Sequence, residues 1–101
     1  MSIKKRTFAK AVNITASTAT NVADLMTTWG GTAGNEGVFL EIGAISADTY
    51  FGHSATVDST TGIKIASGTT RYMVGYTAPL DPSALWIWTT GSKVEINYLC
   101  R

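Results

Sequence analysis

The stretch at residues 49–99 decides the fold of this chain. It reads TYFGHSATVDSTTGIKIASGTTRYMVGYTAPLDPSALWIWTTGSKVEINYL, a series of short apolar runs separated by turns rich in Gly, Ser and Thr. The runs recur about every ten residues, a spacing typical of antiparallel sandwiches and barrels rather than of parallel strands joined by helices. The stretch therefore predicts a compact set of antiparallel strands.

An earlier run at residues 38–42 extends the same pattern. Because successive side chains of a strand point to opposite faces, its residues divide into two sets. Val38, Leu40 and Ile42 lie on one face, and Phe39 and Glu41 lie on the other. The fully apolar set predicts that this strand turns one side to the core.

One short helix is predicted near residues 21–29. Its apolar side chains recur at i, i+3, i+4 and i+7, which places them on one face of a helix. They are Val22, Leu25, Met26 and Trp29. Thr20 or Asn21 would cap the first turn, and the following Gly-Gly pair would end the helix. We expect this apolar stripe to face the core.

The whole pattern predicts a mainly β fold: a small antiparallel β-sandwich or barrel, jelly-roll-like, with one short α-helix. We expect two parts, a basic N-terminal arm or strand at residues 1–14 and a β-sandwich domain at residues 15–101. A chain of 101 residues buries a core of modest size, so burial against a partner would add noticeably to its stability.

Charge is scarce in this chain and unevenly distributed. Charged residues make up 15% of the sequence and the net charge is +1, so nucleic acid is an unlikely partner by charge alone. The basic residues Lys4, Lys5, Arg6 and Lys10 nevertheless fall in the first ten positions, without an acid among them. Such a cluster indicates a solvated arm, an edge strand protected by lysines, or an arm that grips an acidic protein surface.

Cysteine use and hydropathy restrict the setting in which the chain folds. Cys100 is the single cysteine, so an internal disulfide is impossible and folding in a reducing cytoplasm is expected. The longest apolar runs are too short for a signal peptide or for a bilayer span. We therefore expect no membrane association.

Two runs are apolar on both faces. In the run Leu-Trp-Ile-Trp, Trp86 and Trp88 point away from the neighbouring aliphatic residues, and residues 72–74 show the same property. A small sandwich has one core, so the second apolar face needs a cover, either the helix or another subunit. We therefore expect a homo-oligomer. The side chains assigned to its interface or to the core are Tyr72, Met73, Tyr76, Trp86 and Trp88.

No arrangement of residues indicates catalysis. His53 is the single histidine, which excludes a site built from several histidines. Ser54 follows it directly, and adjacent residues of a strand point to opposite faces, which argues against a nucleophile–base pair of these two but does not exclude one. The carboxylates fall near turns, where they have ordinary structural uses. We expect no enzymatic activity, no catalytic residue, no metal and no cofactor.

The C-terminal half resembles a family of small virion proteins of tailed bacteriophages. The resemblance rests on turn and core residues at 50–52, 57, 62–65, 67–68, 72–74, 83–87 and 91–99. It implies a β-sandwich that acts as a capsid cement or decoration protein, stabilising the head by bridging subunits of the major capsid protein. On this hypothesis we expect a trimer on the capsid surface of the virion, made in the host cytoplasm, and the basic cluster suggests Lys4, Lys5, Arg6 and Lys10 as the capsid-binding clamp.

Two other functions remain open at this level. A carbohydrate- or host-surface-binding module would require Trp or Tyr side chains exposed on a flat or concave face. A head–tail or tail component would require a ring of few copies in each particle. The aromatic residues of this chain are compatible with both.

Overall fold

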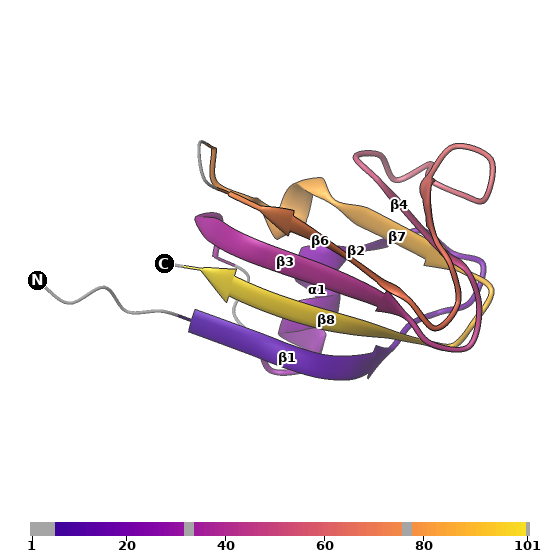
Figure 1. Cartoon of the computed structure of the whole chain (residues 1–101), viewed down its shortest axis with the longest axis horizontal. Helices are drawn as coiled ribbons and strands as arrows, with labels where there is room; N and C mark the ends of the chain where they lie inside the picture. Colours follow the sequence, from indigo (N-terminus) through magenta and orange to yellow (C-terminus); the bar gives the residue numbers. More distant parts are fainter. Residues whose placement is uncertain (1–5, 32–33, 76–77, 101) are drawn as a thin grey trace, which may run out of the picture.

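The computed structural model describes residues 6–31, 34–75 and 78–100, and these form a two-layered β-sandwich (Figure 1). The first sheet has the strand order β1-β8-β3-β6, and the second has the order β2-β7-β4-β5. The elements are β1 (Arg6–Asn13), β2 (Thr20–Asn21), α1 (Val22–Thr28), β3 (Gly37–Ala44), β4 (Thr49–Gly52), β5 (Ile63–Ile65), β6 (Thr70–Val74), the 3-10 turn η1 (Pro82–Ala84), β7 (Trp86–Thr89) and β8 (Lys93–Cys100).

This architecture confirms the predicted fold class. It is mainly β and antiparallel throughout, with one short α-helix, and its described strands form two separate sheets rather than a closed barrel. In Figure 1 the first sheet lies in front, with α1 and the strands of the second sheet behind it. Residues 6–13, within the range predicted as an arm or strand, form β1 and pair with β8.

The C-terminal strand β8 lies at the centre of the first sheet. It pairs with β1 from Arg6 opposite Cys100 to Asn13 opposite Lys93, and it pairs with β3 on its other side. A bulge between Gly37 and Phe39 shifts the β3 register. Buried and exposed residues alternate along β8, as expected for a strand with one face on a core and one face outward.

Helix α1 begins where the sequence predicts but ends at Thr28, before Trp29. Asn21 caps it by accepting a hydrogen bond from the backbone N–H of Asp24 at 3.3 Å, and Gly30 follows the helix at a φ of 86°, a conformation that glycine adopts without strain. The buried residues of α1 are Val22, Leu25 and Met26. The prediction for Trp29 was wrong: it is 37% exposed because it is the C-cap and lies beyond the buried stripe.

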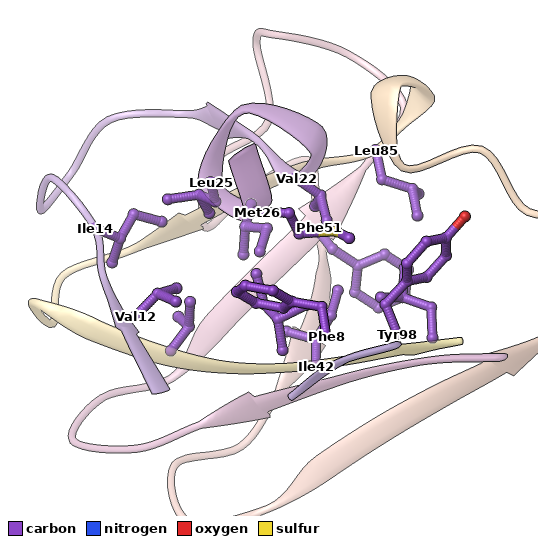
Figure 2. Close-up of a cluster of buried hydrophobic side chains, with 14 of the residues drawn as sticks. Phe8, Val12, Ile14, Val22, Leu25, Met26, Ile42, Phe51, Leu85 and Tyr98 are labelled. Atoms are coloured by element: carbon purple, nitrogen blue, oxygen red, sulfur yellow. The ribbon is translucent and has the colours of Figure 1, made fainter. Parts of the chain in front are cut away.

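The core lies between the two sheets, where both inner faces and α1 contribute side chains (Figure 2). Val12 and Ile42 enter it from the first sheet, Phe51 from the second and Met26 from the helix. A fully buried aliphatic or Met side chain of this kind stabilises the fold by about 1.5–3 kcal/mol. Among the described residues, no helix is long and apolar enough to cross a bilayer.

The core also holds one large polar side chain. Tyr98 is almost completely buried, and its hydroxyl donates a hydrogen bond to the backbone carbonyl of Gly34. Burial raises the pKa of the Tyr98 phenol far above its usual value, with Cys100 adding to the effect. The phenol therefore stays protonated and acts as a hydrogen-bond donor that ties β8 to the segment before β3.

Candidate interaction surfaces

The outer face of the first sheet carries a groove of about 310 Å³. Its lining includes the small residues Ala9 and Ala11 of β1 and Gly43 of β3. Glu95 of β8 lies opposite both Ala11 and Gly43, and Glu41 also lines the groove. Small residues beside longer acidic ones make this surface concave and negatively charged.

The two carboxylates of the groove are accessible. Glu95 is exposed, whereas Glu41 is half-buried and its Oε2 accepts a hydrogen bond from the Thr70 hydroxyl at 3.2 Å. In the described part of the chain the salt bridge found is the one between Lys64 and Asp48, at 3.3 Å. Lys10 also lines the groove, but its ammonium donates a hydrogen bond to the backbone carbonyl of Trp29. Neither carboxylate of the groove forms an ion pair with the described residues.

An apolar ridge borders this groove on the same outer face. The rings of Phe39 and Tyr72 stack with centroids 5.8 Å apart and planes 20° apart. Phe39 lies opposite Val74 on one side and Leu99 on the other. Tyr72, opposite Glu41, is 64% exposed, and Val74 is 39% exposed. We call these four residues the apolar ridge; such exposed clusters on soluble proteins commonly mark contact sites.

The outer face of the second sheet carries a different aromatic group. Trp88 lies opposite Tyr50 on β4, with ring centroids 6.0 Å apart and planes 59° apart. Trp86 lies two residues before Trp88 on the same face and is half-buried, as Trp88 is. The aliphatic residues Leu85 and Ile87 are fully buried on the opposite side. The predicted division of this run between two faces is therefore confirmed.

The loop at residues 53–62 covers part of this second outer face. Val57 is only 4% exposed, yet it does not belong to the main core cluster. Its Cγ2 would lie 3.2 Å from a Cβ added at Gly52 and 2.8 Å from one added at Gly62, and the latter would also be 2.7 Å from the Cβ of Tyr50. Val57 therefore packs outside the sheet, and the two glycines permit the close approach.

Asp58 fixes the shape of this loop. Its carboxylate accepts hydrogen bonds from the hydroxyl and backbone N–H of Thr60, at 2.7 and 2.8 Å, and from the backbone N–H of Thr61 at 3.1 Å. These bonds, first those from Thr60, hold the pKa of Asp58 below its ordinary value of 3.8. The cover over the second sheet is thus an ordered Asx-type turn rather than a chance contact.

Only part of the predicted capsid-binding set can be placed. Lys4 and Lys5 lie outside the described residues, and Arg6 is the first residue of β1. Lys10 is exposed, but its ammonium donates a hydrogen bond to the carbonyl of Trp29 at 3.1 Å. A cation at this position satisfies a carbonyl at the C-terminal end of α1, so Lys10 has a structural role within the chain.

The predicted interface residues fall in three different places. Tyr72 lies on the outer face of the first sheet, and Met73 points inward and packs against the core. Trp86 and Trp88 lie on the outer face of the second sheet. Tyr76 lies outside the described residues. Tyr72 and the tryptophans therefore do not share one surface patch of a single copy.

The described residues bring no catalytic or metal-binding group together. The Nδ1 atom of His53 bonds to the Ala84 carbonyl at 3.1 Å, whereas the Ser54 hydroxyl bonds to that of Thr56 at 2.8 Å. Cys100 is buried. Within the ranges that the structure describes, no three His, Cys, Asp or Glu residues lie close enough to hold a metal ion.

Sequence reasoning missed the acidic groove. Alternation along residues 38–42 does place Glu41 outward, but it says nothing about which strands become neighbours. The pairing of β3 and β1 with β8 brings Glu41 and Glu95 onto one surface although they are far apart in the sequence. The outward position of each acid could be predicted from the sequence. That the two acids share one surface depends on the register of the strands.

The fold and its surfaces define a class: a small antiparallel β-sandwich with two unlike outer faces, one grooved and acidic, the other aromatic. Comparisons with protein-family models, with curated proteins and with solved structures gave no match. The function is therefore argued from these two faces.

Proposed function

We propose that this chain is a bacteriophage capsid cement protein, which stabilises the head by bridging subunits of the major capsid protein. The observation that carries the proposal is the presence of accessible apolar and aromatic side chains on both outer faces of the sandwich, at Tyr72 and Val74 on one and at Trp86 and Trp88 on the other. A bridging protein needs two surfaces that can be occupied at once, and opposite faces of a sandwich meet that need.

The chemistry of the two faces supports adhesion rather than catalysis. Tyr and Trp are enriched in protein–protein contacts because they bury a large area and lose little conformational freedom. Each cement contact can be weak, since simultaneous attachment at two surfaces multiplies the effective affinity. The resemblance of residues 49–99 to tailed-phage virion proteins, which rests on Gly62, Trp86 and similar turn and core positions, supports the same function.

Copy number in the virion tests this proposal most directly. Purified phage particles should contain the protein at a fixed, high ratio to the major capsid protein, because cement proteins occupy repeated positions on the shell. A ratio equivalent to one ring in each particle would favour the head–tail alternative instead. Absence of the protein from purified particles would contradict both functions.

A binding experiment can then identify the face that meets the shell. We expect W86A/W88A to reduce binding of the purified protein to heads that lack it, if the second sheet faces the shell. The matched variant Y72A removes an aromatic ring from the opposite face, so the two variants should differ. Equal binding by both variants and the unmodified protein would contradict an aromatic contact with the shell.

One observation favours a second candidate, a carbohydrate-binding module. Tyr50, Trp86 and Trp88 form a partly exposed aromatic surface. The Lys64–Asp48 ion pair lies at the edge of the same sheet, where Lys64 on β5 is opposite Tyr50. Aromatic platforms bordered by polar groups suit the apolar faces and hydroxyls of sugars. Tryptophan fluorescence that shifts on addition of a glycan would support this candidate, and an unchanged spectrum across a glycan panel would oppose it.

A further inference from the structure

The acidic groove of the first sheet has a chemically matched occupant in the chain itself. We propose that the basic segment at residues 1–5 of one copy binds in the groove of a second copy, with Lys5 next to Glu41 and Glu95 and Lys4 adding to the positive charge of the segment. The contact would link neighbouring copies into an oligomer. It assigns these two lysines to the contact between copies rather than to the shell.

Charge complementarity is the first argument. Neither Glu41 nor Glu95 takes part in a salt bridge with the described residues, and both line a concave surface where a partner side chain can be enclosed. The segment before β1 contains two lysines and no acid. Opposite charges on two surfaces steer encounter and set the register of the contact, and the effect weakens as salt is added.

The apolar ridge supplies the second argument. In an extended segment, Ile3 and Lys5 project on the same side, about 7 Å apart. On the groove face, Tyr72 lies directly opposite Glu41 in the sheet register, and directly opposite side chains have Cβ atoms about 5 Å apart. An extended segment can therefore place Ile3 on the Tyr72 ring while Lys5 reaches the Glu41 carboxylate.

The position and composition of the segment favour a second copy over the same copy. Strand β1 begins at Arg6, opposite Cys100, whereas the groove residue Ala11 lies opposite Glu95 further along the sheet. To enter its own groove, the chain would have to reverse direction just before Arg6. Residues 1–5 are Met-Ser-Ile-Lys-Lys, and the two lysines next to Arg6 are not among the Gly, Pro, Asn, Asp and Ser residues that favour such a turn. Extended, they reach about 17 Å, enough to cross a neighbouring groove.

A contact of this kind has a definite consequence for assembly. Each copy contributes one basic segment and one acidic groove, which lie in different places, so the interface is heterologous and repeats from copy to copy until a ring closes. The proposal concerns the isolated protein. It can therefore hold even if the protein does not bind phage heads, and a failure to bind heads would not contradict it.

The test is the size of the full chain in solution, measured by sedimentation velocity at low and high salt. We expect the unmodified protein to associate with increasing concentration, and less at high salt. The variants K4E/K5E and E41K/E95K should each self-associate at least about ten-fold more weakly than the unmodified protein, because each brings like charges together. An equimolar mixture of the two variants should recover association, since each segment then meets a groove of opposite charge.

Controls separate this contact from general charge effects and from misfolding. The control variant A55E/S59E adds two acids at exposed positions of the 53–62 loop but leaves the segment and the groove unchanged, so it should associate as the unmodified protein does. Deletion of residues 1–5 should abolish association without altering the described strands, as circular dichroism can verify. A monomeric unmodified protein at low salt, full association of K4E/K5E, or a mixture that stays monomeric would each overturn the proposal.

Discussion

The two outer faces of this sandwich differ in how completely the chain covers them. The second sheet has short strands, and the 53–62 loop folds over its outer side, with Val57 buried against Gly52 and Gly62. The first sheet has three strands of eight residues, and its outer side is left with an acidic groove and an exposed apolar ridge.

The difference indicates which outer face is covered by other residues of the same chain. The 53–62 loop, which hydrogen bonds to Asp58 hold in shape, covers part of the outer face of the second sheet and so reduces the apolar area that this face exposes. Nothing comparable among the described residues covers Tyr72 or Val74, and exposed clusters of this kind favour contact with a partner. The chain therefore covers part of the outer face of the second sheet by itself and leaves the outer face of the first sheet open to a partner.

The largest effect is expected when a substitution on the inner face of β7 is compared with one on its outer face. Ile87 is fully buried, so Ile87→Ala should lower the free energy of unfolding by about 2–5 kcal/mol. Its neighbour Trp88 is half-buried on the outer face, so Trp88→Ala should cost the isolated chain less. Urea unfolding of both variants measures the difference. An equal or larger loss for Trp88→Ala would show that this ring belongs to the core.

A smaller effect is expected for loosening the cover of the second sheet. Val57→Ala removes two buried methyl groups between Gly52 and Gly62 and should lower the free energy of unfolding by about 1–2 kcal/mol. Amide exchange should accelerate at Val57 and Gly62, whose N–H groups bond within the loop. Ala55→Ser, at an exposed position of the same loop, is the control and should leave exchange unchanged. Unchanged exchange in Val57→Ala would contradict the role given to this loop.

The smallest effect is expected for the change in the free energy of unfolding with pH that arises from Asp58 in the 53–62 loop. The pKa of Asp58 in the folded state lies below its ordinary value of 3.8, so the folded state binds fewer protons than the unfolded state there. The stabilisation by Asp58 is therefore present above about pH 4 and is lost as the pH falls through the lowered pKa. Asp48, whose pKa is lowered by the N–H of Ser67 and by Lys64, acts in the same direction.

The measurement is urea unfolding at a series of pH values from neutral to about pH 2.5. Asp58→Asn removes one titrating group from the loop, so its stability should fall less steeply below about pH 4 than that of the unmodified protein. Asp24→Asn, at an exposed helix position, is the matched control. Identical slopes for Asp58→Asn and the unmodified chain would contradict the linkage.

Local pattern predicted much of the fold because it reports on local physics. The alternation at residues 85–88 put Ile87 and Trp88 on opposite faces, as the structure does, and the helical stripe placed Val22 and Met26 in the core. Trp29 fitted the same stripe but is the C-cap, since periodicity does not register where a helix ends. The prediction of two apolar faces on one strand was equally local: it separated the tryptophans from the aliphatic residues but did not say which set faces the core.

The candidate surfaces depended on pairing between distant segments. The sequence by itself determined which side chains of each strand point inward, because backbone geometry fixes that alternation. Only the tertiary structure decided that β8 lies between β1 and β3, which brings Glu41 and Glu95 to one groove and places Tyr72 on the face opposite Trp88. The reason is that strand pairing and register are set by the burial of whole faces against each other, a property of the complete sandwich rather than of any one strand.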